Sequence, residues 1–243
     1  MRAGPAIALA LMLADATGAS AQDGAIRFGL TGDYPPYAQR LPDGSFEGAD
    51  VVTARAVAKR LGKRAIFVPT SWQTLSRDFI AGRFDVVIGG LTITPERAAI
   101  GTYSFALVDD GKRPLARCAD RHAYASLRAI ERPGVRVQIN TGQTIGALAK
   151  QWFSKANVTI NPDDADLPQA LLDGRADVWI TDGVVVDHMA RRYAGRLCAT
   201  TRKPFTHQEK AWLIRRDAGL VAAVNAALRR EKAGWERALR AVP

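Results

Sequence analysis

The sequence predicts an α/β protein of two lobes, each a mostly parallel sheet flanked by helices, with the chain crossing twice between them. Two observations predict this class. Short runs of apolar residues alternate with segments whose apolar residues recur every three or four positions. This alternation occurs in both halves of the chain, and an extended stretch without it separates them. Alternating strands and helices favour parallel sheets, with ligand chemistry at the carboxyl ends of the strands.

The pattern of the first half predicts a βαβαβ unit. Its expected elements are a strand at 26–31, a helix over 54–61, a strand at 65–68, a helix over 71–82 and a strand at 86–88. Ser71 is a good N-cap for the second of these helices. Gly62 and Gly82 lie where the two helices should end, as C-cap glycines commonly do.

The second half repeats the pattern. Its expected elements are a strand at 136–139, helices over 144–153 and 167–172, and a strand at 178–181. Residues 104–118 and 198–205 are extended, and we expect them to be the two crossings. If residues 210–214 and a helix through 221–235 pack back on the first half, the second lobe is an insertion. The predicted division is a leader at 1–21, a first lobe at 22–110 plus 204–243, and a second lobe at 111–203.

The first residues predict a secretory signal peptide. Arg2 precedes a short apolar run at 6–13, and Ala-Ser-Ala at 19–21 provides a cleavage site of small residues. The run is too short to span a bilayer, and no other segment approaches that length. We expect the mature chain to begin near Gln22, to be periplasmic and not to insert stably into a membrane.

The two cysteines fit an oxidising compartment. Cys118 and Cys198 lie far apart, unlike a redox pair or a metal knuckle, so we expect one structural disulfide, with two buried thiols as the alternative. The three histidines are scattered, and we expect neither a metal nor another cofactor. The net charge of +10 comes without an aromatic ladder or a basic stripe, which favours a solvated basic surface over nucleic-acid binding.

Polar residues follow every strand that is predicted to be buried. These strand endings are residues 31–37, 69–72, 89–97, 139–144 and 180–183. Together they hold Arg97, whose planar fork suits a carboxylate, and Asp182, which suits an ammonium group. Tyr34 and Trp72 would form aromatic walls. The pattern predicts a pocket for an amino acid between the lobes.

The motifs resemble a known family. "RFGLTGDYPPY", "GGLTITPER", "TGQT" and "WITDG" occur in the order and spacing of the amino-acid family of periplasmic solute-binding proteins. The resemblance covers nearly the whole mature chain and implies the two-lobed type II fold of periplasmic binding proteins. Within the family, "VPTSWQTLSRDF", "DGKRP", "EKAWLIRRD" and the placing of both cysteines are most similar to the cyclohexadienyl dehydratases, which convert prephenate or arogenate into phenylpyruvate or phenylalanine.

The resemblance implies a role for each residue of the pocket. It places Arg97, the Thr92 hydroxyl and the backbone N–H of Thr144 on a ligand carboxylate, and Asp182 on an α-ammonium group. A bidentate arginine–carboxylate pair is a strong contact, and a buried aspartate needs a cationic partner. The alternatives are an exposed helix position for Arg97 and a helix N-cap for Asp182.

The resemblance also concerns the rest of the pocket. Tyr34 and Trp72 correspond to aromatic residues that sandwich the ligand side chain, with plain core packing as the alternative for Trp72. Lys112 and Lys210 keep the dehydratase pattern and would hold a second carboxylate, unless they are solvated lysines. Asp33, beside Tyr34, completes the set of expected ligand-binding residues.

The same resemblance raises the question of catalysis. In the dehydratases a glutamate three residues after the aspartate of "TD" protonates the departing oxygen, and here that position is Val185. Asp187, Asp33, Glu209 and His207 are the remaining acids, and none has a motif to recommend it. No catalytic residue is therefore assigned.

The resemblance and the missing acid favour binding. We expect a periplasmic solute-binding protein that captures an amino acid or related small carboxylate and delivers it to an inner-membrane ABC permease. A cyclohexadienyl dehydratase is the alternative. A sensor domain is a third class, which we do not favour because no membrane tether follows Pro243.

Overall fold

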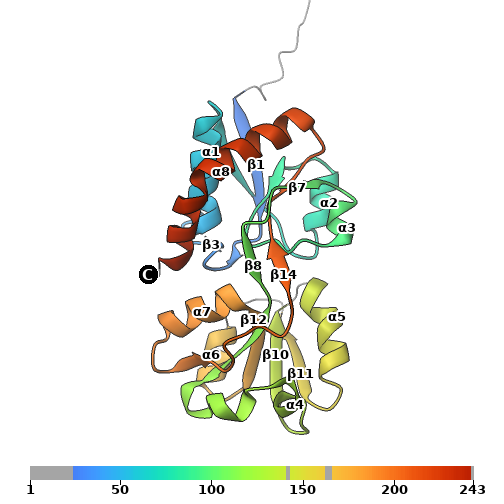
Figure 1. Ribbon diagram of the computed structural model, residues 1–243, viewed down its shortest axis with the longest axis vertical. Coiled ribbons are helices and arrows are strands. Elements are labelled where there is room, and N and C mark those ends of the chain that lie inside the picture. Colours follow the sequence, from blue (N-terminus) through green and yellow to red (C-terminus); the bar gives the residue numbers. More distant parts are fainter. Residues whose placement is uncertain (1–23, 141–142, 162–165, 242–243) are drawn as a thin grey trace, which may run out of the picture.

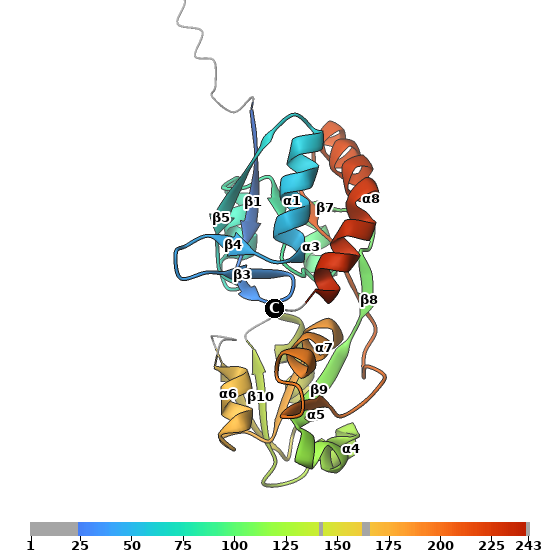
Figure 2. The ribbon, with the colours of Figure 1, turned by 90° about the vertical axis from the view of Figure 1, so that its left-hand side faces the viewer.

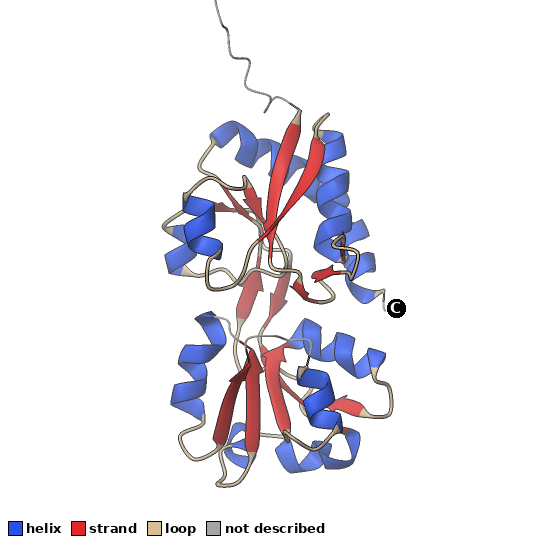
Figure 3. Ribbon diagram, turned by 180° about the vertical axis from the view of Figure 1, so that it is seen from behind, coloured by secondary structure: helices blue, strands red, loops and turns tan. Residues whose placement is uncertain are grey.

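The computed structural model describes residues 24–140, 143–161 and 166–241, which form two lobes stacked along the long axis (Figure 1). The expected signal peptide at 1–21 lies outside the described residues. Each lobe has a five-stranded sheet with helices on both faces (Figure 3). In the described part of the chain, none of the helices combines the length and the apolar character that crossing a membrane would require.

The sheet of the first lobe has the strand order β5-β1-β6-β15-β7. Its strands are β1 (Ala25–Leu30), β5 (Arg64–Pro69), β6 (Val86–Val87), β7 (Thr102–Tyr103) and β15 (Leu213–Ile214). β1 is parallel to β5 and β6, whereas β15 is antiparallel to β6 and β7. The helices of this lobe are α1 (Ala49–Arg60), α2 (Leu75–Ile80), α3 (Pro95–Ala98) and the long α8 (Ala218–Arg240). The chain thus returns to its first sheet, and α8 packs along α1 (Figure 2).

The sheet of the second lobe has the order β11-β10-β12-β9-β13. Its strands are β9 (Lys112–Arg117), β10 (Arg136–Asn140), β11 (Asn157–Asn161), β12 (Val178–Asp182) and β13 (Leu197–Ala199). β10 is parallel to β11 and β12, and β9 is antiparallel to β12 and β13. Its helices are the 3-10 helix η1 (Cys118–Tyr124), α4 (Leu127–Ile130), α5 (Gln143–Trp152), α6 (Leu167–Leu172) and α7 (Gly183–Arg192).

Two strands connect the lobes. β8 (Val108–Asp110) and β14 (Gln208–Lys210) pair with each other in antiparallel fashion, and both run between the lobes in Figure 1. β8 lies within the stretch expected to cross first. The second crossing comes later than the expected 198–205, because Thr200 and Phe205 still donate backbone hydrogen bonds to carbonyl groups of β9. The exact lobe bounds that we predicted stay a prediction.

Several elements differ in length from the sequence prediction. α1 begins earlier than expected, at Ala49, because its first half buries the polar residues Asp50 and Thr53, which do not contribute to an apolar pattern. α2 begins later, at Leu75, because Ser71 caps a preceding turn in which its hydroxyl accepts from the backbone N–H of Thr74. The short strands β2 (Asp33–Tyr34), β3 (Ala38–Arg40) and β4 (Phe46–Glu47) were not predicted, since such short strands carry no periodicity.

The disulfide prediction is confirmed, because Cys118 and Cys198 are bonded. The bond joins the start of η1 to β13, next to the paired strands β9 and β13. The two cysteines are 80 residues apart in the sequence, so the bond closes a long loop. A cross-link of that span restricts the unfolded chain considerably.

Reduction is therefore expected to destabilise the protein. For a loop of this length the loss is about 4 kcal/mol, or a fall in melting temperature of roughly 10 °C. Thermal unfolding with and without a phosphine reductant measures it. A Cys118→Ser/Cys198→Ser double variant should have the same melting temperature as the chemically reduced protein. The reductant should not change the melting temperature of this variant. Free thiols in exported, native protein would contradict the prediction.

Candidate ligand-binding site

A cavity between the lobes brings together most of the predicted site residues. Eight of the nine expected ligand-binding residues line it, and Asp33 is the exception. The eight are Tyr34, Trp72, Thr92, Arg97, Lys112, Thr144, Asp182 and Lys210. In the first lobe they come from β2, α3 and the loops that follow β5 and β6. In the second lobe they come from β9, α5 and β12, and Lys210 comes from β14 between the lobes. The cavity measures about 20 Å³, so the side chains close on one another.

The loop after β6 positions Thr92 and Arg97. Gly89 and Gly90 both have positive φ angles, 104° and 73°, which glycine adopts freely. Their N–H groups donate to the buried Asp50 carboxylate over 2.7 and 3.0 Å. This carboxylate fixes the turn that aims the rest of the loop into the cleft.

Arg97 is buried with its hydrogen bonding incomplete. Only 4% of the residue is exposed, and one Nη donates to the Thr92 carbonyl oxygen over 3.0 Å. Its Nε has no partner among the described residues. Burial lowers the pKa of the guanidinium, but arginine stays protonated in proteins. A buried donor without an acceptor is costly, so this side of the cavity favours an anionic ligand group.

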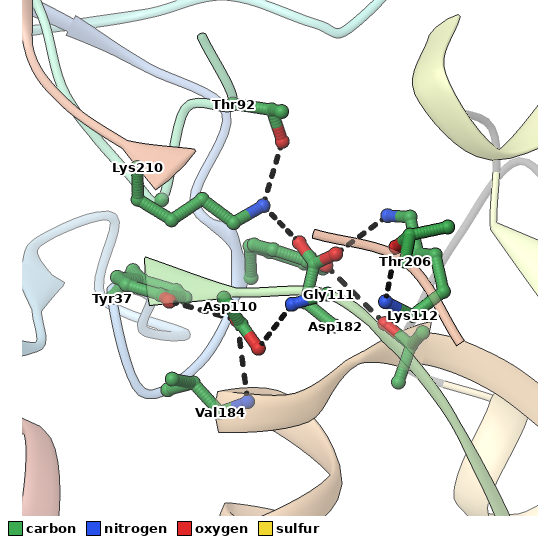
Figure 4. A network of polar contacts seen from close by, with 12 residues as sticks. Tyr37, Thr92, Asp110, Gly111, Lys112, Asp182, Val184, Thr206 and Lys210 are labelled. Atoms are coloured by element: carbon green, nitrogen blue, oxygen red, sulfur yellow. Dashed lines mark hydrogen bonds and ion pairs between the residues drawn. The ribbon is translucent and has the colours of Figure 1, made fainter. Parts of the chain in front are cut away.

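Asp182 occupies the centre of a buried ion-pair network, drawn in Figure 4. One carboxylate oxygen accepts from Lys112 Nζ over 2.6 Å, and the other accepts from Lys210 Nζ and from the Tyr34 hydroxyl. Lys210 Nζ also reaches the Thr92 hydroxyl at 2.7 Å. Burial alone would raise the pKa of Asp182, but the two lysines hold it well below its usual range. Asp182 is thus already neutralised by the protein.

This network differs from the role that the resemblance implied for Asp182. We expected its carboxylate to be paired by the ammonium group of a ligand. In this structure Lys112 and Lys210 are its cationic partners instead. The N-cap alternative also finds no support, because Asp182 precedes α7 without a side-chain capping bond. The lysines are not solvated, since Lys112 and Lys210 are 3% and 1% exposed.

The charged side chains that line the cavity are not balanced. Arg97, Lys112 and Lys210 are cationic, and Asp182 is the one carboxylate among the lining residues. The nearby Asp110 accepts from the backbone N–H groups of Gly111 and Val184. Burial raises the pKa of Asp110, and the negative charge of Asp182 raises it further. Asp110 therefore contributes less negative charge near the cavity than an ordinary carboxylate. The lining therefore carries an excess of positive charge.

Aromatic side chains form the first-lobe wall. The rings of Tyr34 and Trp72 meet edge to face with centroids 5.7 Å apart. Trp72 Nε1 donates to the Asp33 carboxylate over 3.1 Å. Asp33 itself lines the neighbouring pocket rather than this cavity, and here its carboxylate anchors the tryptophan ring.

The candidate acids do not line this cavity. Val185 is buried, but it faces the neighbouring pocket. Asp187 has a half-exposed side chain that pairs with Arg113 over 2.7 Å. His207 and Glu209 are exposed and line the wider opening beside the cavity.

Three lining residues, Gly90, Asn140 and Ile145, were not among the predicted ligand-binding residues. Gly90 lies within the strand ending 89–97, from which only Thr92 and Arg97 were predicted. Asn140 ends β10 and is 7% exposed, and Ile145 follows Thr144 at the start of α5. Asn140 belongs to the same class of polar strand endings that identified the other residues, so the signal existed. Ile145 carries no polar signal and is found only from the fold.

Two lobes, a pair of crossing strands and a charged cavity between them define a solute-binding protein. The model of the bacterial extracellular solute-binding proteins, family 3, matches residues 26–238, and the chain belongs to this family. The solved structures that are similar to this chain are type II periplasmic binding proteins, and this confirms the predicted fold class. Members of the family bind amino acids and work with ABC transporters.

The relatives include both binders and an enzyme. A cyclohexadienyl dehydratase of Pseudomonas aeruginosa is 36% identical over 197 residues, 81% of this chain and 73% of that protein. The L-cystine-binding protein TcyJ of Escherichia coli is 28% identical over 206 residues, 84% and 76% of the two chains. Among solved structures, the ancestral amino acid-binding protein AncCDT-1, a precursor of cyclohexadienyl dehydratase, has a TM-score of 0.77 and 30% identity, covering 88% of this chain and 92% of its own.

Proposed function

We propose that the protein captures a small carboxylate in the cleft between its lobes and delivers it to an ABC permease. The observation that carries the proposal is Arg97, a buried guanidinium whose Nε lacks an acceptor among the described residues. Thr92 and Thr144 line the same cavity. A ligand carboxylate would supply the missing acceptor and accept further hydrogen bonds from this end of the cleft.

The charge of the lining supports a ligand with more than one acidic group. Asp182 already has Lys112, Lys210 and the Tyr34 hydroxyl as partners. An α-ammonium group would have to displace one of these lysines, whereas a second carboxylate would meet the excess positive charge. We therefore place dicarboxylates and acidic amino acids ahead of cationic amino acids as ligands.

The proposed role includes movement and export. A cavity of about 20 Å³ has room for a single water at most. Ligand entry then requires the lobes to separate about β8 and β14, in the manner of hinged binding proteins. We also propose that residues 1–21 act as a signal peptide and that the mature protein is periplasmic. Extracellular relatives of this family support that location.

The test is a comparison of ligands that differ in charge. Mature protein is titrated calorimetrically with prephenate, L-glutamate and L-arginine, and thermal shifts are recorded alongside. We expect the two diacids to bind more tightly than L-arginine. Preferred binding of L-arginine would contradict the proposed ligand class, and no binding of any carboxylate would contradict the proposed site.

A dehydratase is the second candidate, and the 36% identity to the Pseudomonas aeruginosa enzyme favours it. It needs an acid that reaches a ligand held by Arg97. The resemblance places that acid at Val185, which has no proton to donate. Asp182, the carboxylate that does line the cavity, has a depressed pKa because of its lysines and is a poor proton donor at neutral pH.

We accordingly expect no measurable conversion of prephenate or arogenate. Formation of the aromatic product is followed with mature protein, and the Pseudomonas aeruginosa dehydratase serves as the positive control. Thermal stabilisation by prephenate without turnover supports the binder. Efficient turnover would establish the enzyme and show that another group supplies the proton.

A further inference from the structure

A second pocket lies beside the first cavity and is separated from it by Tyr34, which lines both. It measures about 320 Å³, at the lower end of the range for small-molecule sites. Its first-lobe wall is the segment around β2 and β3, and its second-lobe wall comes from α6, β12 and α7. The pocket therefore spans the two lobes.

One side of α7 forms much of the second-lobe wall. Val185, His188, Met189 and Arg192 line the pocket, and their spacing of three and four residues places them along one side of a helix. Trp179 of β12 adds an aromatic surface next to them. Apart from the imidazole, the indole N–H, the guanidinium and the hydroxyl group of Tyr193, the side chains of this wall are apolar.

Two of these residues carry buried polar atoms without a partner. His188 is 3% exposed, and neither ring nitrogen has a hydrogen-bond partner among the described residues. The Nε1 of Trp179, a fully buried residue, likewise lacks one in the described part of the chain. Such atoms cost free energy unless something else satisfies them. Their occurrence together on one pocket indicates a ligand with an oxygen that reaches them.

The charge state of the pocket follows from its neighbours. Burial, then the charges of Arg191 and Arg192, lower the pKa of His188 to about 4. At neutral pH the ring is uncharged and offers one donor and one acceptor. Arg40 and Arg192 are exposed residues of the lining, on opposite lobes. An anionic group of the ligand would therefore lie toward solvent, between the two guanidinium groups.

We propose that this pocket is a second ligand site, for a small aromatic acid that carries a hydroxyl group. The ring lies against Trp179 and Met189, and the hydroxyl meets the Trp179 N–H and the His188 ring. The carboxylate lies at the rim, near Arg40 and Arg192. Because the walls belong to different lobes, the bound acid stabilises the closed arrangement of the protein. Tyr34 couples this site to the first one, since its hydroxyl donates to Asp182 over 2.7 Å.

The test must separate this site from the first cavity, where an acid could also bind. Calorimetry is carried out with 4-hydroxyphenylacetate as the probe and with the Arg97→Ala protein, in which the first cavity has lost its main carboxylate partner. Binding is expected to persist there. On that background, Trp179→Phe removes the N–H but keeps a ring, and Arg192→Ala removes a rim charge. Each is expected to weaken binding by up to about fivefold.

Matched controls make the result specific. Arg191→Ala removes the same charge from the adjacent, exposed position of α7, which does not line the pocket, and is expected to leave binding unchanged. If Trp179→Phe does not fold cooperatively, His188→Gln and Arg192→Ala provide the answer. The proposal is overturned if the probe does not bind, if binding disappears with Arg97→Ala, or if Arg191→Ala and Arg192→Ala weaken it equally.

Discussion

Replacing Arg97 with alanine is expected to weaken ligand binding by about 2–5 kcal/mol, the range for loss of one partner of a buried charge pair. Arg97 is 4% exposed as a residue, and one Nη of its guanidinium donates to the Thr92 carbonyl oxygen. Its Nε is left for the ligand, so the side chain is oriented before binding. Preorganised donors make the loss larger than that of a surface arginine. Calorimetric titration with prephenate or L-glutamate measures it.

The fold should survive this change. Arg97 does not appear in any ion pair between described residues, and its removal takes an incompletely satisfied charge out of the protein. Arg216→Ala is the matched control, because Arg216 is exposed and binds the backbone carbonyl groups of Ala98 and Ala99 at the end of the same short helix. We expect that control to bind normally. Unchanged affinity in a folded Arg97→Ala protein would show that the carboxylate binds elsewhere.

The sequence predicted the members of the site better than their contacts. Thr92, Thr144 and Asp182 were found because the carboxyl ends of parallel strands meet at one edge of a sheet. The pairing of Asp182 with Lys112 was not found, because it depends on strand register. The two residues are direct cross-strand partners between β12 and β9, and no local pattern reveals that alignment.

The position of Lys210 has the same explanation. It forms an isolated bridge with Thr92, which brings the lysine of the second crossing to the loop after β6. The crossing was predicted too early because residues 198–205 are extended without belonging to the hinge. Extended sequence indicates a strand or a connection, and only the hydrogen bonds of Thr200 and Phe205 to β9 distinguish the two.

Strand-end reasoning also could not separate the two pockets. Asp33 and Tyr34 are adjacent in the sequence, but side chains alternate along β2, and only Tyr34 reaches the first cavity as well. Tyr34 lines both pockets, whereas Asp33 lines the second and supports Trp72. The side on which Val185 lies depends on the rotation of α7, which the sequence does not specify.

Replacing Lys210 with methionine is expected to destabilise the protein by about 3 kcal/mol at neutral pH. Methionine keeps most of the side-chain volume but removes the ammonium group from a carboxylate that is 1% exposed. Removing one partner of a buried pair costs about 3–5 kcal/mol, and the remaining Lys112 places the effect at the lower end. Urea unfolding measures the change.

The control for this variant is an exposed lysine. Lys232→Met breaks an exposed pair with Glu236 at 3.7 Å on α8, and we expect a loss below about 1 kcal/mol. The variant Asp182→Asn/Lys210→Met removes both charges of one pair, and a cycle with the single variants isolates their coupling. Equal losses for Lys210→Met and Lys232→Met would mean that the buried network contributes no more than a surface pair.

The stabilisation by this pair should depend on pH in one direction. The pKa of Asp182 in the folded protein lies below its ordinary value of 3.8 because of Lys112 and Lys210, although burial opposes the shift. As the pH falls, the unfolded chain therefore takes up the proton on Asp182 before the folded protein does. The contribution of the pair to folding stability is complete well above the ordinary pKa of aspartate and is lost as the pH falls below it. The advantage of the natural protein over Lys210→Met should be constant from pH 7 to about pH 5 and should shrink toward pH 3. An advantage of the same size at pH 3 would show that Lys210 stabilises the fold by packing and not through the charge of Asp182.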